Sequence, residues 1–192
     1  MDLVQSYYEQ HSEAFIESTL HVDMGEIYEA FISHVPAHGK ILDVGCGSGR
    51  DLKWFLEKGF DVLGLEPCAP LAAHARRYSG VTVVETMVED WDTDRRFEGI
   101  WACASLLHLD QVRCANALRR FSEWMHESSV AYVSFKYGDF IGVRNGRFFM
   151  DLTEDSLVEL LPSSLSVKQF WTTKDKRPDR NEAWLNALLV RE

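Results

Sequence analysis

The chain has 192 residues, of which 46% are hydrophobic, and a formal net charge of −10. This length favours one domain with an ordinary core, and no run approaches the roughly 18 consecutive apolar residues of a membrane span. The acidic balance disfavours nucleic acid as a partner. The start "MDLVQSYYEQ" lacks the basic and apolar blocks of a secretion signal, so we expect a cytoplasmic protein.

The four cysteines form no C-x-x-C pair, which argues against a disulfide framework and against a zinc site. They stand at Cys46, Cys68, Cys103 and Cys114. We expect reduced thiols, most of them packed, and no metal.

The first 35 residues contain seven acidic residues and neither lysine nor arginine. Within them, apolar residues recur at helical spacing and predict a helix over about 22–35, ended by Pro36 and Gly39. We therefore expect an N-terminal helical cap over 1–35, followed by the main domain over 36–192, with the chain forming one structural unit.

From Lys40 onward, short apolar runs alternate with helical patterns, which is typical of an α/β fold with a mostly parallel sheet and helices on both faces. The predicted strands cover 40–45, 61–66, 81–85, 98–105, 129–135, 165–172 and 183–190. The predicted helices cover 51–59, 71–78 and 110–125, and a further helix follows Thr153. The last two strands have no helix between them and predict a terminal antiparallel pair, while 136–151 and 173–182 are expected to be irregular.

The stretch "ILDVGCGSGRD" joins the first strand to the first helix of this sheet. A dinucleotide fingerprint reads G-x-G-x-x-G, but here Arg50 occupies the position of its third glycine. Gly45 and Gly47 would let backbone approach a ligand closely, with Asp43 as an acceptor beside them. Glu66 ends the second strand, 21 residues after Gly45, where a carboxylate can hold the two hydroxyls of a ribose.

These residues carry a family resemblance, which runs from about residue 36 to the end. "LDVGCGSG" resembles the first motif of the class I S-adenosylmethionine-dependent methyltransferases, and Glu66 and the terminal strand pair match that family as well. The resemblance implies a Rossmann-like, seven-stranded, mostly parallel sheet with a terminal antiparallel strand. "GCGSGRD", "WACASLLHL", "SFKYG" and "GRFF" resemble the small stand-alone bacterial branch that includes tellurite-resistance-type enzymes.

The resemblance also implies S-adenosylmethionine as cofactor, S-adenosylhomocysteine as product and a small molecule as methyl acceptor. It places the cofactor against Asp43, Gly45, Cys46, Gly47, Glu66, Pro67, Cys68, Cys103 and Ala104. Where many relatives bind adenine through an aspartate, this chain has Met87. Either the backbone of Met87 and Val88 replaces that aspartate, which we favour, or Glu89 does.

Arg50 is unusual because a cation in the first turn of a helix opposes the helix dipole. An anion is therefore expected nearby. A bidentate contact to the cofactor's methionine carboxylate would supply one, and a pair with Asp51 is the alternative.

The acceptor site is expected beyond the carboxyl ends of the strands. His108 is a candidate general base, or else a structural histidine. Basic and aromatic residues of 136–150 are candidates to bind an anionic or oxygen-rich acceptor, or else they form a solvated lid. The candidates are Lys136, Tyr137, Arg144 and Arg147. The basic residues of 174–180 either reach the opening of the same site or lie on the surface of a turn, and we favour the turn.

In the N-terminal cap, Tyr7 is the first candidate to cover the methyl group and Phe15 is the second. The alternative is that this segment only covers an exposed edge of the sheet.

The sequence leaves three other functions open. The chain could be a non-catalytic module that binds S-adenosylmethionine, a methyltransferase of tRNA or protein, or a nicotinamide-dependent oxidoreductase. Arg50 and the terminal strand pair argue against the last, and the acidic cap argues against tRNA. We expect a monomer or a homodimer.

Overall fold

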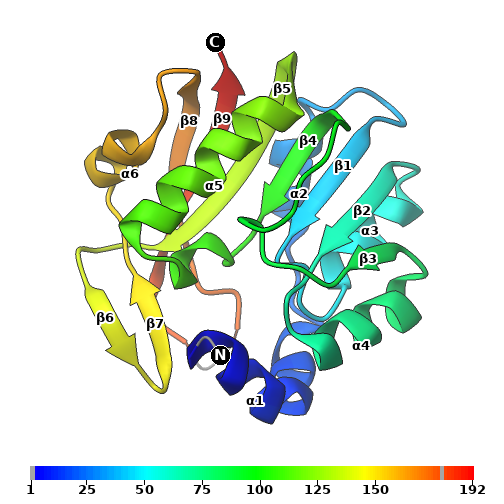
Figure 1. The fold of residues 1–192 in the computed structure, drawn as a ribbon, viewed down its shortest axis with the longest axis vertical. Coiled ribbons are helices and arrows are strands. Elements are labelled where there is room, and N and C mark those ends of the chain that lie inside the picture. The colour runs from blue at the N-terminus through cyan, green and yellow to red at the C-terminus, as the bar shows by residue number, and fades with distance from the viewer. Residues whose placement is uncertain (1–2, 178–179) are drawn as a thin grey trace.

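The computed structural model describes residues 3–177 and 180–192, and a seven-stranded sheet forms its centre (Figure 1). The strands follow the order β3-β2-β1-β4-β5-β9-β8. They are β1 (Lys40–Val44), β2 (Asp61–Leu65), β3 (Thr82–Val84), β4 (Phe97–Ala102), β5 (Met125–Lys136), β8 (Leu165–Lys174) and β9 (Ala183–Arg191). The pairs among β1 to β5 are parallel, and β9 is antiparallel to both β5 and β8. The predicted strands and the terminal antiparallel strand are confirmed.

The central strands are buried on both faces, which explains their nearly continuous apolar sequences. In β1, the neighbours Ile41 and Leu42 are both fully buried, and their side chains belong to different cores. Ile41 packs in the cluster that contains Phe31, whereas Leu42 packs in the cluster that contains Phe121. This alternation of side chains places one hydrophobic core on each face of the sheet.

Helices cover both faces, as predicted (Figure 1). On one face lie α5 (Gln111–Trp124) and α6 (Glu154–Leu160), and on the other lie α2 (Gly25–Ile32), α3 (Arg50–Glu57) and α4 (Ala69–Ser79). The helix expected over 22–35 is shorter than predicted and buries Ile27, Tyr28 and Phe31 against the sheet.

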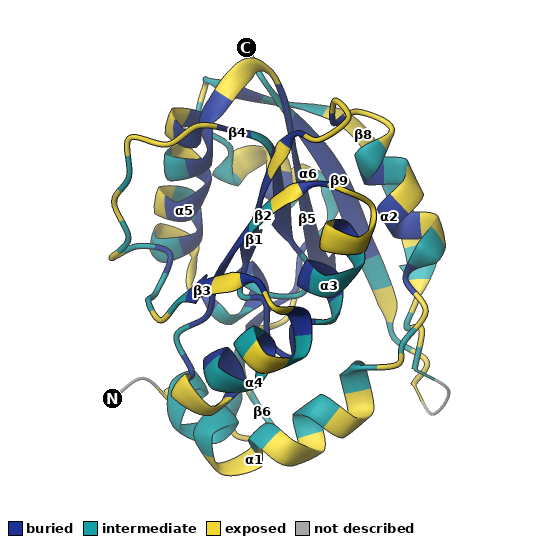
Figure 2. Cartoon of the chain, turned by 90° about the vertical axis from the view of Figure 1, so that its right-hand side faces the viewer, coloured by how far each residue is buried: buried dark blue, intermediate teal, exposed yellow. Residues whose placement is uncertain are grey.

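The first helix, α1 (Leu3–Thr19), lies beside α4 and the hairpin strand β7 rather than on a face of the sheet (Figure 1). None of its residues is fully buried, and Figure 2 shows it in the colours of intermediate and exposed residues only. It bends at His11, where the backbone leaves helical geometry (φ −122°, ψ 20°). Helix α1 therefore covers one end of the sheet with a half-exposed surface.

The prediction that 136–151 is irregular is wrong. This segment contains a two-stranded hairpin of β6 (Ile141–Arg144) and β7 (Arg147–Met150). Asn145 and Gly146 form its turn, both with positive φ (49° and 75°), which is the geometry that an Asn-Gly pair favours between antiparallel strands. The Asn-Gly dipeptide was thus a readable hairpin signal.

The strand expected to end at 172 continues to Lys174. Of the stretch expected to be irregular, 173–182, positions 178 and 179 lie outside the described residues. Among the helices that the structure describes, none has the length and apolar character needed to cross a membrane.

We expect Phe31→Ala to lower the free energy of unfolding by about 3–5 kcal/mol, because Phe31 is fully buried between Phe55 and Trp101. Val112→Ala is the matched control, since Val112 is 72% exposed and should change stability by no more than about 0.5 kcal/mol. Urea unfolding followed by circular dichroism measures both. Equal losses in the two variants would contradict the assignment of Phe31 to the core.

Candidate functional site

A cavity of about 640 Å³ lies at the carboxyl ends of the parallel strands, with α1 along one side. The glycine loop after β1, residues 45–49, borders it, and its three glycines all have positive φ and close neighbours. A Cβ on Gly47 would lie 3.0 Å from the Phe15 ring, and one on Gly49 would lie 2.8 Å from the Cα of Ala75 in α4. Gly47 therefore lets α1 close onto the loop, and Gly49 lets α3 and α4 pack together.

Glu66, directly after β2, lines the cavity and is buried. Its two carboxylate oxygens accept hydrogen bonds from the backbone N–H groups of Gly47 and Cys68, both at 2.9 Å. Burial raises the pKa of Glu66 to about 7, although these two N–H groups act in the opposite direction. The glycine loop thus orients Glu66 without using all the lone pairs of its carboxylate.

Asp43 lies behind the cavity wall and is not among the residues that line it. It is 1% exposed, and its Oδ2 atom has no hydrogen-bond partner among the described residues. Burial raises its pKa, and the nearby carboxylates of Asp51 and Glu66 raise it further, against the influence of Arg50. We call Asp43, Asp51 and Glu66 the acidic end of the site.

Arg50, at the start of α3, lines the cavity and pairs with its neighbour Asp51 at 2.5 Å. The Asp51 carboxylate also accepts hydrogen bonds from the Tyr28 hydroxyl and from the Trp101 indole at 2.8 Å. Burial acts to raise the pKa of Asp51, but the charge of Arg50 and these three donors hold it below its ordinary value. Arg50 further donates to the Thr19 carbonyl at 3.2 Å, which connects the end of α1 to α3. Of the two anions expected near Arg50, the structure contains Asp51. Because Arg50 also lines the cavity, the contact with a cofactor carboxylate stays a prediction.

The residues predicted to surround an adenine line the cavity together. They are Pro67, Cys68, Met87, Val88 and Glu89. The Glu89 carboxylate pairs with Arg113 at 2.5 Å through Oε1, while its buried Oε2 has no partner among the described residues. Adenine could be bound by the backbone of Met87 and Val88 or by the carboxylate of Glu89, and both alternatives stay predictions.

At the end of β4, Cys103, Ala104 and Ser105 line the cavity. Ala104 has a positive φ of 53°, rare for a residue other than glycine, and its N–H donates to the Ser134 hydroxyl at 2.9 Å. The Ser105 hydroxyl oxygen is buried and has no partner in the described part of the chain. Burial raises the pKa of the Cys103 thiol to about 12, so this thiol stays protonated at neutral pH. This strained turn presents polar groups that the protein itself does not fully pair.

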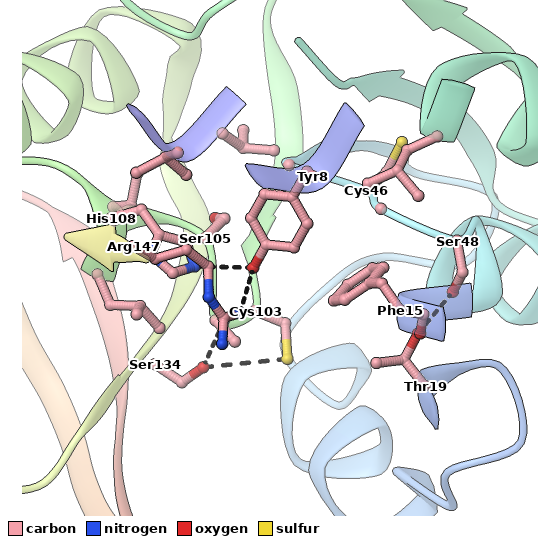
Figure 3. A pocket seen from close by; sticks show the side chains of 18 of the residues that line it. Tyr8, Phe15, Thr19, Cys46, Ser48, Cys103, Ser105, His108, Ser134 and Arg147 are labelled. Carbon is pink, nitrogen blue, oxygen red and sulfur yellow. Dashed lines mark hydrogen bonds between the residues drawn. The ribbon is translucent and has the colours of Figure 1, made fainter. Parts of the chain in front are cut away.

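His108 lines the same cavity beside Tyr8 (Figure 3), and both of its ring nitrogens have hydrogen-bond partners. Nδ1 lies 2.8 Å from the Phe148 carbonyl, which can only accept, so Nδ1 carries the proton. Nε2 then accepts from the Tyr8 hydroxyl at 2.9 Å, and Arg147 donates to the same hydroxyl at 3.1 Å. Tyr8 is thus the tyrosine at the centre of this network, while Tyr7 lines the cavity and stacks on His11.

Sequence reasoning named Tyr7 and missed Tyr8. The spacing of Tyr8, Phe15 and Thr19, seven and then four residues apart, places these three on one face of a helix and was a usable signal. Phe15, the second candidate, lies against Gly47. The N-terminal helix thus reaches both the glycine loop and His108.

Three of the four predicted acceptor residues, Lys136, Arg144 and Arg147, line the cavity. Tyr137 does not: its side chain is 43% exposed and donates to Glu154 at 2.9 Å. The preference for a decorative turn over 174–180 is wrong, because its basic residues and the tryptophan after it line the cavity. These are Lys174, Lys176, Arg177, Arg180 and Trp184. We call the lysines and arginines of 136–180 that line the cavity its basic end.

Residues 41–128 match the family described as "Methyltransferase domain". A ubiquinone biosynthesis O-methyltransferase from Nitrobacter winogradskyi is 32% identical over 90 residues, a match that covers 42% of this chain and 34% of that relative. The matched stretch therefore spans about a third of the length of this curated relative.

Two solved structures resemble the whole chain. A 1,6-didemethyltoxoflavin-N1-methyltransferase from Burkholderia thailandensis, with 1,6-didemethyltoxoflavin and S-adenosylhomocysteine bound, has a TM-score of 0.84 at 21% identity and covers 98% of this chain and 87% of its own. The N-methyltransferase NodS from Bradyrhizobium japonicum, in complex with S-adenosylhomocysteine, has a TM-score of 0.77 at 13% identity and covers 96% of this chain and 98% of its own.

The domain match, the strand order and these structural likenesses agree with one another. Residues 41–128 thus match a methyltransferase domain, and the chain has the fold of these two S-adenosylhomocysteine-bound methyltransferases.

Proposed function

We propose that the protein binds S-adenosylmethionine and transfers its methyl group to a small molecule. The observation that carries this proposal is that Glu66 and the glycine loop line the same cavity as His108 and the basic end. One cavity thus offers a nucleoside site and a second polar site next to each other. Class I relatives that carry S-adenosylhomocysteine in their structures support the choice of cofactor.

The charges at the acidic end support a ligand with positive charge. Three carboxyl groups, those of Asp43, Asp51 and Glu66, are buried at this end, and the guanidinium of Arg50 pairs with one of them, Asp51. The unpartnered Oδ2 of Asp43 marks where a further donor is needed, because a buried acceptor without a partner is costly. The ammonium group of S-adenosylmethionine would supply such a donor, and its sulfonium would add a second positive charge. In this assignment Glu66 holds the ribose hydroxyls, and Arg50 contacts the methionine carboxylate while it remains paired with Asp51.

When bound, S-adenosylmethionine supplies an activated methyl group. The protein then has to bind, orient and exclude water, and these effects supply most of the acceleration in a displacement of this kind. Helix α1 contributes to the exclusion of water, since Tyr8 and Phe15 line the cavity from its side. Cys103 and Ala104 border the reaction centre in this assignment.

A proton leaves the acceptor when an O–H or N–H group is methylated, and we assign its removal to His108. Because Nε2 of His108 already accepts from Tyr8, the proton passes through the Tyr8 hydroxyl. The acceptor proton moves to the Tyr8 oxygen as the Tyr8 proton moves to Nε2. Nδ1 keeps its proton and donates to Phe148, which orients the ring throughout.

A small-molecule acceptor fits this cavity better than a macromolecule, since α1 and the hairpin of β6 and β7 border it. The bound 1,6-didemethyltoxoflavin of the Burkholderia structure supports the same choice. The tellurite-resistance-type branch stays a prediction. A non-catalytic module that binds S-adenosylmethionine is the second candidate.

Incubation with S-adenosylmethionine and a pool of small hydroxy and amino compounds tests the proposal. We expect S-adenosylhomocysteine to form only when acceptors are present. Calorimetric titration with S-adenosylmethionine and with NAD runs beside it. Tight S-adenosylmethionine binding without turnover would favour the non-catalytic module, and binding of NAD alone would refute the proposal.

We expect the affinity for S-adenosylhomocysteine to depend on pH through Glu66. The carboxyl group has a pKa raised to about 7, so it is ionised above that pH and becomes protonated as the pH falls through it. The ionised form accepts both ribose hydroxyls, so Kd should rise up to about tenfold from about pH 8 to about pH 6. Glu66→Gln should bind more weakly at high pH and lose this dependence. A variant with the wild-type pH profile would show that Glu66 does not hold the ribose.

We expect Arg50→Lys to raise the Kd for S-adenosylhomocysteine about tenfold, because lysine lacks the planar pair of donors that suits a carboxylate. 5′-Methylthioadenosine is the matched control ligand, since it has the nucleoside and the sulfur but no amino-acid tail. Its affinity should stay unchanged. Equal losses for both ligands would assign Arg50 to the Asp51 pair alone.

A further inference from the structure

Most cations of the basic end already have a carboxylate partner. Four such pairs join a lysine or arginine that lines the cavity to an acidic residue, at distances of 3.0 Å or less. They are Lys136 with Glu182, Arg144 with Asp151, Lys176 with Glu26, and Arg177 with Asp175. A partnered cation has less to gain from a ligand anion, so these four are poor candidates to select one.

Arg147 differs from them. Over residues 3–177 and 180–192, no carboxylate lies within 4.0 Å of its guanidinium. Its Nη1 donates to the Tyr8 hydroxyl at 3.1 Å, and its Nε is buried without a partner among the described residues. Figure 3 shows its guanidinium directed at Tyr8 within the pocket.

Aromatic rings hold this guanidinium in place. Its central carbon lies 4.5 Å from the centre of the Tyr7 ring, 5.1 Å from Phe149 and 5.6 Å from Tyr8. Such rings stabilise a cation without neutralising its charge or taking its in-plane N–H donors. The charge and the Nε donor of Arg147 are therefore kept for a group from outside the chain.

We propose that Arg147 is the residue that selects the acceptor, and that the acceptor carries a carboxylate or another planar oxyanion. This inference rests on the proposed function, because it concerns the acceptor end of the same cavity. A planar oxyanion accepts two parallel N–H bonds from a guanidinium, and burial in an aromatic surround strengthens both. The Tyr8 hydroxyl, bonded to Arg147 and His108 alike, then lies beside the bound acceptor.

The alternative is that Arg147 only fastens α1 to β7 through Tyr7 and Tyr8. In that case the loss of Arg147 would loosen α1, and the affinity for S-adenosylhomocysteine would fall whether or not an anionic ligand is present. Anion selection instead predicts an effect confined to anionic ligands at the acceptor end.

Benzoate and benzamide are the probes, since they share a flat ring and differ in charge. Each is titrated by calorimetry into protein saturated with S-adenosylhomocysteine at neutral pH. We expect wild-type protein to bind benzoate at least about tenfold more tightly than benzamide. Arg147→Gln should remove this preference and leave the affinity for S-adenosylhomocysteine unchanged.

Arg95→Gln is the matched control, because Arg95 is exposed, does not line the cavity and gives the same change in net charge. It should keep the benzoate preference. Benzoate that binds wild-type protein no better than benzamide, or equally well to Arg147→Gln, would overturn the inference. Loss of S-adenosylhomocysteine binding in Arg147→Gln would assign Arg147 to the fastening of α1.

The same titrations separate this inference from the proposed function. Failure of wild-type protein to bind S-adenosylhomocysteine would refute the proposed function, and benzoate would then be titrated into the protein alone. Binding of S-adenosylhomocysteine without a benzoate preference would refute only the role of Arg147.

Discussion

The buried carboxylate of Asp51 joins the parts of the chain that form the site. It accepts hydrogen bonds from Arg50 in α3, Tyr28 in α2 and Trp101 in β4. Through Arg50 the connection extends to the Thr19 carbonyl at the end of α1. A buried charge is stable only while all its donors stay in place, so this carboxylate fixes three helices and a strand around the glycine loop.

Charged residues of both signs line the cavity. Asp51 and Glu66 line it beside the glycine loop, with Asp43 behind them, whereas the lysines and arginines other than Arg50 come from 136–180, and most of these are paired with carboxylates. The overall charge of −10 does not reveal this arrangement, because the basic residues that line the cavity are concentrated in 136–180.

Helix α1 shows why the site was harder to predict than the fold. It has no fully buried residue, so hydrophobic periodicity gives little information about its orientation. Its position depends on contacts with distant residues, such as Tyr8 with His108 and Phe15 with Gly47. The only local pattern that could have distinguished Tyr8 from Tyr7 as a cavity residue was the spacing of Tyr8 to Phe15, seven residues apart.

The sequence by itself determined the positions of the strands along the chain, the glycine turn and the place of Glu66 directly after β2. Those features follow from local constraints, since apolar periodicity and positive φ act over a few residues. Only the tertiary structure decided that Arg50 pairs with Asp51, that Tyr8 bonds His108, and that Arg147 lacks a carboxylate among the described residues. The contacts of Tyr8 with His108 and Arg147 join residues 100 and 139 positions apart and depend on how helices and strands pack, which no local pattern encodes.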